Sequence, residues 1–374
     1  MQFNRREWLK AMGGGAAAAA SAKSLAMAAR PESKTDASKL RMPGPFPGRV
    51  VSVENPAVLV SGKYQAAAVQ QMMQRGMTEL TGADSWADAW RLFFGPGDVV
   101  GIKLNPVGQP LVKSDATVVR EIIAGLKAAG VRNQDIIAYD RYRDQFFQAG
   151  YDKWLPEGVR TSYAADHFEH IQMGMDGYDP DHYLDMALTL PGYGVDNATA
   201  RRSFAARFIT RQVNKLINVP VLKDHQSAGV TLALKNMSHG LVNNVSRSHS
   251  SSTLNACNAF IPAVVSLPVI RNKAVLHILD GVKGLYDGGP GARPEFVWEH
   301  RTLYFATDPV ALDHVGWEVI DAKRVSAGMK TLYEATPDKF SSFVHRQPEH
   351  VEIAGALGLG VWDRDKIDLR QLKI

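Results

Sequence analysis

Short β-branched runs alternate with longer segments of helical apolar spacing along most of this 374-residue chain. Six runs have the composition of buried strands: residues 50–53, 98–103, 136–139, 213–222, 274–279 and 302–306. Five segments have helical spacing: residues 64–80, 117–129, 230–237, 254–267 and 309–322. This alternation predicts an α/β fold, a parallel or mixed β-sheet flanked by helices. A polar insertion rich in Asp, Tyr and His, at about residues 150–202, shows no clear period.

The N-terminus has the pattern of a targeting segment. The pair Arg5-Arg6 precedes the alanine run 16–20 and the A-x-A site at 26–28. This order predicts a signal peptide over residues 1–28, and the arginine pair indicates the twin-arginine route. We therefore expect the twin-arginine translocase as a partner during export, and a periplasmic or otherwise exported location. A basic terminus with a chance arginine pair and an uncleaved anchor are the alternatives.

Residues 29–48 are polar and then rich in proline and glycine, which predicts a flexible linker before an α/β domain over residues 49–374. The chain has a formal net charge of +5, of which the predicted signal peptide carries +3 and the remainder +2. So small a balance gives no support for a nucleic-acid partner. No later segment has 18 consecutive apolar residues, so we expect a soluble mature form without a stable membrane span.

Cys257 is the only cysteine of the chain. One thiol cannot form an internal disulfide, and it cannot hold a conventional cysteine-ligated iron–sulfur cluster. Export in the folded state suits proteins that acquire a cofactor before export. The sequence does not identify such a cofactor, and no intrinsic iron–sulfur cluster is expected.

Polar side chains follow each of five predicted strands. Their positions are Lys103 and Asn105, Asp140 and Arg141, Lys223 to His225, Asp280 to Lys283, and Thr307 and Asp308. If these strands are mutually parallel, their carboxyl ends line one edge of the sheet, where ligands bind in α/β proteins. Charges that merely cap turns are the alternative interpretation of each strand end taken alone.

The collected side chains suit a small anion. Clustered cations bind carboxylate or phosphate, a desolvated lysine can lose its proton, and a histidine can transfer one. The predicted catalytic residues are Lys103, Asn105, Lys223, His225, Lys235 and Asp280, and the predicted substrate-binding residues are Arg141, Asn236, Lys283 and Asp308. We expect the lysines to hold or activate the anion, His225 to transfer protons, and Asp280 to orient a cation or a lysine.

Three further motifs are weaker. His167-Phe168-Glu169-His170 offers metal ligands, but its spacing matches no zinc pattern. The sequence therefore does not show whether a metal binds. His239 and His249 lie in a polar stretch and either close over a site or are solvated loop residues. The glycine-rich segment 287–293 lacks the ending of a P-loop, and Pro290 removes a backbone donor. A flexible surface loop is the favoured interpretation of this segment.

Several of these strand ends carry a family resemblance. Residues 100–105, 218–225, 229–236, 280–284, 307–313 and 356–360 resemble the family called Domain of Unknown Function 362. The resemblance covers about residues 95 to 370. It implies an α/β fold and a group whose members often carry twin-arginine signals. Some relatives append a ferredoxin-like iron–sulfur module, from which this single-cysteine chain departs. Because the family's reaction is not established, no catalytic role carries over.

We expect an enzyme that acts on a small anionic substrate at a crevice of Lys, His and Asp side chains. The alternatives are a periplasmic ligand-binding or cofactor-maturation protein, and a redox component that works with an iron–sulfur partner. A binding protein would retain its ligand without turnover, and a redox component would need a partner for its electrons.

Overall fold

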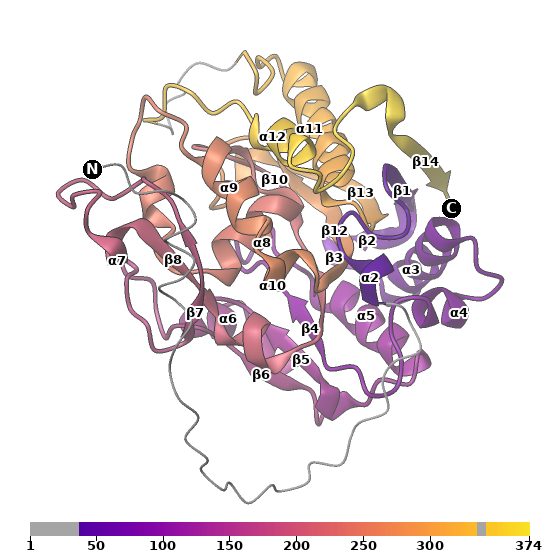
Figure 1. Cartoon of the computed structure of the whole chain (residues 1–374). Coiled ribbons are helices and arrows are strands. Elements are labelled where there is room, and N and C mark those ends of the chain that lie inside the picture. The colour runs from indigo at the N-terminus through magenta and orange to yellow at the C-terminus, as the bar shows by residue number, and fades with distance from the viewer. Residues whose placement is uncertain (1–36, 335–341) are drawn as a thin grey trace, which may run out of the picture. The chain divides into compact units, whose positions relative to one another are not determined.

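A ten-stranded mixed β-sheet lies at the centre of the fold (Figure 1). The computed structural model describes residues 37–334 and 342–374, so the predicted signal peptide lies outside the described residues. The main path of the sheet has the order β14 (Asp368–Lys373), β1 (Arg49–Glu54), β13 (Val297–Ala306), β12 (Ala274–Leu285), β9 (Lys215–Asn218), β4 (Val100–Lys103), β5 (Ile136–Tyr139) and β6 (Arg160–Ser162). Beside β12 lie also β10 (Val221–His225) and its partner β11 (Gly229–Val230). The predicted α/β fold is confirmed.

Helices cover both faces of this sheet. One apolar cluster joins the sheet to α3 (Ala66–Thr81), α4 (Trp86–Arg91) and α5 (Ala116–Ala128). Two others join the opposite face to α8 (Leu232–Leu241), α9 (Cys257–Val265) and α11 (Pro309–Ser326). The shorter helices are α2 (Ala37–Leu40), α6 (Arg143–Gln148), α7 (Ala198–Arg201), α10 (Pro268–Arg271) and α12 (His350–Ala356). Over the described ranges, no helix combines the length and apolar character needed to cross a membrane.

The period of two along each strand decides which layer a side chain faces. In β4, Val100 and Ile102 belong to the apolar cluster with α3, α4 and α5. The intervening Gly101 and the terminal Lys103 therefore face the layer of α8 and α9. A Cβ on Gly101 would lie 2.4 Å from the ring of Phe208, so this strand accepts only glycine there without rearrangement.

The direction of β13 differs from the parallel arrangement that the sequence analysis considered. β12 pairs in parallel with β9 and β10, but it pairs antiparallel with β13. The two strands are consecutive and joined by a short connection, which brings the chain back in the opposite direction. The polar residues after β13 therefore lie at the opposite edge of the sheet from those after β4 and β5.

Two strand boundaries also differ from those predicted. The expected strand 274–279 continues to Leu285 as β12. The expected strand 213–222 is divided into β9 and β10 at Val219-Pro220, since proline supplies no backbone N–H for the ladder. β9 pairs with the first half of β12 and β10 with its second half, so β10 extends beyond the end of β4.

Helix boundaries agree more closely with the pattern. The predicted helix 117–129 is α5, and 309–322 forms most of α11. Asp308 is the N-cap of α11: its Oδ1 accepts hydrogen bonds from the backbone N–H groups of Val310 at 2.9 Å and Ala311 at 3.0 Å. Satisfying these otherwise unpaired donors stabilises the helix start.

Two segments expected to be irregular contain ordered structure. The described part of the expected linker holds Leu40 and Met42, which are 4 % and 1 % exposed and pack into the apolar clusters. The polar insertion contributes β6 and α7, together with β7 (Tyr178–Asp185), which pairs with β8 (Arg202–Ala206). A small hairpin of β2 (Leu59–Val60) and β3 (Lys63–Tyr64) precedes α3.

The contact between α3 and the sheet makes a stability prediction. A Cβ on Gly76 of α3 would lie 2.1 Å from the ring of Phe305, which is fully buried. Gly76→Ala should therefore lower the free energy of unfolding by roughly 1–3 kcal/mol, despite the better helix propensity of alanine. The control is Gly95→Ala, where no atom lies within 4 Å of the added Cβ. Urea denaturation of both variants tests this, and equal effects would contradict it.

Candidate functional site

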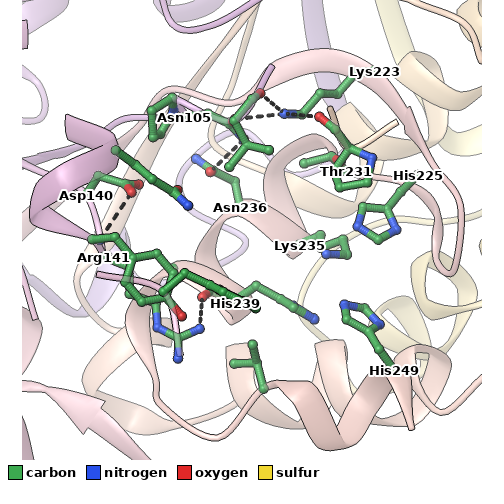
Figure 2. Close-up of a pocket in the computed structure, with 18 of the residues that line it drawn as sticks. Asn105, Asp140, Arg141, Lys223, His225, Thr231, Lys235, Asn236, His239 and His249 are labelled. Carbon is green, nitrogen blue, oxygen red and sulfur yellow. Dashed lines mark hydrogen bonds between the residues drawn. The ribbon is translucent and has the colours of Figure 1, made fainter. Parts of the chain in front are cut away.

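A cavity of about 330 Å³ lies between α8 and the carboxyl ends of β4, β5 and β10. Most of the predicted site residues line it: Lys103, Asn105, Arg141, Lys223, His225, Lys235 and Asn236. They come from three strand ends and one helix, as expected for the carboxyl edge of parallel strands. Figure 2 shows Asp140 and Arg141 on one side of the cavity, with His225 and His249 on the opposite side.

Asn236 of α8 is the centre of a hydrogen-bond network that joins the helix to the strands. Its Oδ1 accepts from the side-chain nitrogens of Asn105 at 3.0 Å and Lys103 at 3.3 Å. Its Nδ2 donates to Oδ1 of Asn218 at 2.7 Å, and Asn218 donates to the backbone carbonyl of Ala233 at 3.0 Å. Every polar atom of the Asn236 amide thus has a partner, which fixes the helix in position over the strand ends.

Among the described lysines that line the cavity, Lys103 is the one paired with a carboxylate. Its Nζ lies 2.6 Å from Oδ1 of Asp140, and both side chains are almost fully buried. It also donates to the carbonyl of Leu104. Gly240 of α8 makes room for it, because a Cβ there would lie 2.0 Å from Cε of Lys103. Lys103 and Asp140 together add no net charge to the cavity.

Lys223 is held by uncharged oxygen atoms. Its Nζ donates to Oδ1 of Asn105 at 2.9 Å, to the carbonyl of Pro290 at 3.3 Å and to the carbonyl of Val107. Burial, and next the neighbouring ammonium of Lys235, lower the pKa of Lys223 to about 7. This lysine is therefore only partly protonated near neutral pH.

Lys235 points into the cavity from α8 and is 6 % exposed. Within the part of the chain that the structure describes, its ammonium has neither a hydrogen bond nor an ion pair. Burial lowers the pKa of Lys235 to about 8. A desolvated ammonium without a partner is unfavourable, so this group is the one that most needs an external anion.

Arg141 contributes a third uncompensated charge. Its guanidinium donates to the hydroxyl of Tyr178 at 3.0 Å, to the amide oxygen of Gln172 at 2.9 Å and to the carbonyl of His239 at 3.2 Å. These partners are neutral, and they hold the planar group rigidly against the cavity wall. Because a guanidinium has five N–H groups, two remain available to a ligand.

The histidines of the cavity are neutral. Burial, and next the ammonium of Lys235, hold the pKa values of His225 and His239 well below the usual range, and the same two causes lower that of His249 to about 3. Nδ1 of His225 accepts a hydrogen bond from the backbone N–H of Ser227 at 3.1 Å. The ring proton of His225 therefore resides on Nε2, which makes this side chain a neutral donor.

Three predicted site residues lie elsewhere. Asp280 shares the strand face of Ile278, on the α3–α5 side of the sheet, and accepts from the hydroxyl of Tyr64 at 3.1 Å and the backbone N–H of Asp115 at 3.0 Å. Lys283 lies over the ring of Tyr64. Asp308 caps α11 at the opposite edge. The expectation that all five strand ends converge is corrected by the long β12 and the reversed β13.

The glycine-rich segment 287–293 is part of the cavity wall rather than a flexible surface loop. The backbone N–H of Gly289 donates to Oδ1 of Asp224 at 2.9 Å, and a Cβ there would lie 2.2 Å from the backbone oxygen of Asp224. Arg324 pairs with Asp287 at 2.7 Å and Arg346 with Asp287 at 3.3 Å. These buried ion pairs fix the segment that presents the Pro290 carbonyl to Lys223.

A known protein family matches the part of the chain that forms most of the cavity. The sequence pattern described as Domain of unknown function (DUF362) matches residues 100–318. This chain belongs to that family. The matched stretch runs from β4 into α11, and it contains every predicted site residue. No curated protein matches the sequence.

One similar solved structure is the crystal structure of a Thermotoga maritima protein, a structural genomics target. It is 12 % identical with a TM-score of 0.38, and the match covers 72 % of this chain and 61 % of that one. The chain thus spans less than two thirds of the length of that protein.

Among the residues not assigned to the site from the sequence are Asp140 and Ser227, which line the cavity, and Cys257, which is buried beside it. Asp140 follows the same strand as Arg141, so its position was visible, but its role as the partner of Lys103 was not. Ser227 lies near His225 in sequence, whereas Cys257 begins a separate helix, and no spacing pattern links it to His249. From the segment 167–170, Phe168 lines this cavity, whereas His167 and Glu169 line a neighbouring one.

The lysines of this DUF362 domain should respond oppositely to removal of their charge. Lys103→Met leaves Asp140 buried without its partner and should lower the free energy of unfolding by roughly 3–5 kcal/mol. Lys235→Met removes an unpaired buried ammonium, and should leave the free energy of unfolding at neutral pH unchanged or higher. Urea denaturation of the two variants measures this, and a large loss for Lys235→Met would contradict it.

The pH dependence of the free energy of unfolding tests the same property of Lys235 in the unmutated protein. The pKa of Lys235 is about 8 in the folded chain and about 10.4 when unfolded, so the unfolded state binds more protons between these values. This group therefore makes the free energy of unfolding rise as pH increases from about 8 to 10. The rise should be smaller in Lys235→Met.

Proposed function

We propose that this protein is an enzyme acting on a small molecule that carries a carboxylate or phosphate group, bound by Arg141, Lys223 and Lys235. The supporting observation is that three buried cations line one cavity, while Asp140, the one carboxylate among the described residues that line it, is occupied by Lys103. Buried charges without counterions are unfavourable. An anionic ligand supplies the missing charge, and the free donors of Arg141 suit its paired oxygens.

The side chains support distinct roles in such a reaction. Arg141 is held by hydrogen bonds and keeps two free N–H groups, so it is placed to orient the anion, whereas Lys223 contributes its positive charge. Lys235 is unpaired and its pKa lies near 8, which suits a group that gives and takes a proton near neutral pH. The Nε2–H of His225 can donate to an oxygen that gains negative charge during the reaction. We therefore assign proton transfer to Lys235 rather than to His225.

Anion binding is the first test. Phosphate and small mono- and dicarboxylates should bind the purified protein, as measured by isothermal titration calorimetry. Lys223→Met or Lys235→Met should weaken the affinity roughly 10- to 100-fold, because each removes a positive charge beside the bound anion. Lys127→Met removes an exposed charge from α5 on the other face of the sheet and should have no effect. The proposal fails if the cavity variants bind as the unmutated protein does.

The number of protons taken up on anion binding is a second quantity that the same titration measures. An anion beside Lys223 and Lys235 raises their pKa values, so binding between about pH 7 and 8 should take up protons. Calorimetry in two buffers of different ionisation enthalpy measures this uptake. Turnover of a bound anion separates an enzyme from a ligand-binding or cofactor-maturation protein, and a dependence on an iron–sulfur partner would indicate a redox component.

We also propose that the chain is exported by the twin-arginine translocase and works in the periplasm or outside the cell. Support comes from the order of the arginine pair, the alanine run and the A-x-A site within residues 1–28. The double variant Arg5→Lys, Arg6→Lys should remain in the cytoplasm of a bacterium with this pathway, as judged by fractionation. The control Lys23→Arg should be exported. Export of the double variant at the normal level would contradict the proposal.

A further inference from the structure

A second group of side chains meets beside the lysines of the cavity. His239 lies on α8, His249 ends the short helix Ser246–His249, and Cys257 begins α9. One nitrogen of each histidine and the sulfur of Cys257 all lie within 4.8 Å of one another. Three elements thus bring two imidazoles and one thiol to a single point.

We propose that His239, His249 and Cys257 bind a divalent cation of borderline softness, of the zinc type. Two nitrogens and one thiolate are ligands that zinc prefers, whereas magnesium and calcium prefer oxygen. Both histidines line the cavity while Cys257 is buried behind them. The fourth coordination position therefore faces the cavity, an arrangement typical of catalytic rather than structural zinc.

The distances suit a common metal ion. Metal bonds of about 2.0 Å to nitrogen and 2.3 Å to sulfur place tetrahedral ligand atoms about 3.3–3.6 Å apart. Nδ1 of His249 lies 3.2 Å from Sγ of Cys257. This pair is already near the required spacing, and the His239 nitrogen lies within 4.8 Å of the other two ligand atoms. The cavity provides the path by which the ion enters.

The surrounding hydroxyl groups support the arrangement. Oγ of Ser238 lies 2.9 Å from Nδ1 of His239 and can donate its own proton to the carbonyl of Lys235 at 3.3 Å. In this arrangement Nδ1 of His239 carries the ring proton and Nε2 has the lone pair for the metal. Nε2 lies 3.1 Å from Oγ of Ser248, which can donate instead to the carbonyl of Val245 at 2.7 Å. Oγ of Ser227 lies 2.9 Å from Nδ1 of His249, the nitrogen that would bind the metal, so this contact gives way to the metal, while Oγ of Ser227 keeps its contact with Nδ1 of His225 at 3.1 Å.

Metal binding replaces existing contacts of Cys257 and His249. In the metal-free protein the thiol of Cys257 donates to the carbonyl of Ser248 at 3.4 Å. The bond that forms joins the thiolate sulfur to the cation, and the thiol proton is released to solvent. Zinc undergoes no change of oxidation state, so the step needs no oxidant or reductant.

Cobalt(II) titration of the unmutated, full-length protein tests the site directly. Bound cobalt should show visible d–d bands of a tetrahedral site and a near-ultraviolet sulfur-to-cobalt charge-transfer band. Since Cys257 is the only cysteine, that band reports this residue alone. Zinc should displace cobalt with a stoichiometry of one ion per chain, measured by elemental analysis after dialysis. Absence of the charge-transfer band would overturn the proposal.

Variants separate the ligands from their supporting residues. Cys257→Ser should abolish the charge-transfer band, and His249→Gln should weaken zinc binding at least 100-fold. Ser238→Ala should weaken it roughly 10- to 100-fold, because it frees the ring of His239. The control His170→Gln, an exposed histidine that is not one of the three proposed ligands, should bind zinc normally. Zinc binding that survives both Cys257→Ser and His249→Gln would contradict the assignment.

The metal site does not depend on the proposed anion site. Anion binding should be measured on protein freed of metal with a chelator, and metal binding in a buffer without phosphate or carboxylates. Lys235→Met should therefore weaken the anion while leaving the cobalt spectrum in place. Loss of one property with retention of the other shows which proposal fails.

Discussion

The side-chain amide of Asn236 is the contact on which the cavity depends. It joins α8 to the ends of two neighbouring strands by accepting from Lys103 and Asn105 and donating to Asn218. A buried donor or acceptor that loses its partner destabilises the fold by about 1–3 kcal/mol, so this network holds only as a complete set. Because α8 also carries Lys235 and His239, the same amide determines where the proposed anion and metal ligands point.

The cationic side chains of the cavity differ in whether a carboxylate neutralises their charge. Lys103 has its own carboxylate, whereas Arg141 and Lys223 are held only by neutral partners and Lys235 by none found in the described residues. Rigid neutral contacts keep the donors oriented without weakening their attraction for an anion, which is the physical meaning of preorganisation. Beside them, the proposed zinc ligands present neutral nitrogens and a thiol. If a metal cation binds His239, His249 and Cys257, one anionic ligand in the cavity would contact both the cation and the nearby ammonium groups.

Much of the fold and part of the site follow from local patterns. Strand β5, helix α5 and the Asp308 cap were predictable because apolar period and capping chemistry are properties of neighbouring residues. The direction of β13 and the face of Asp280 were not, since both depend on how far β12 extends and on what it pairs with. Cys257 illustrates the same limit: its contact with His249 results from the packing of α9 against the cavity wall.

Gly240 shows how small a feature sets the balance of charge. Because its side chain is only a hydrogen atom, this position of α8 leaves space for the side chain of Lys103 to reach Asp140. A methyl group there would overlap the lysine stem and force the ion pair apart, leaving one extra positive and one extra negative group to face the ligand. The electrostatic character of the cavity is therefore encoded in the spacing between a helix backbone and a strand, as well as in the charged residues themselves.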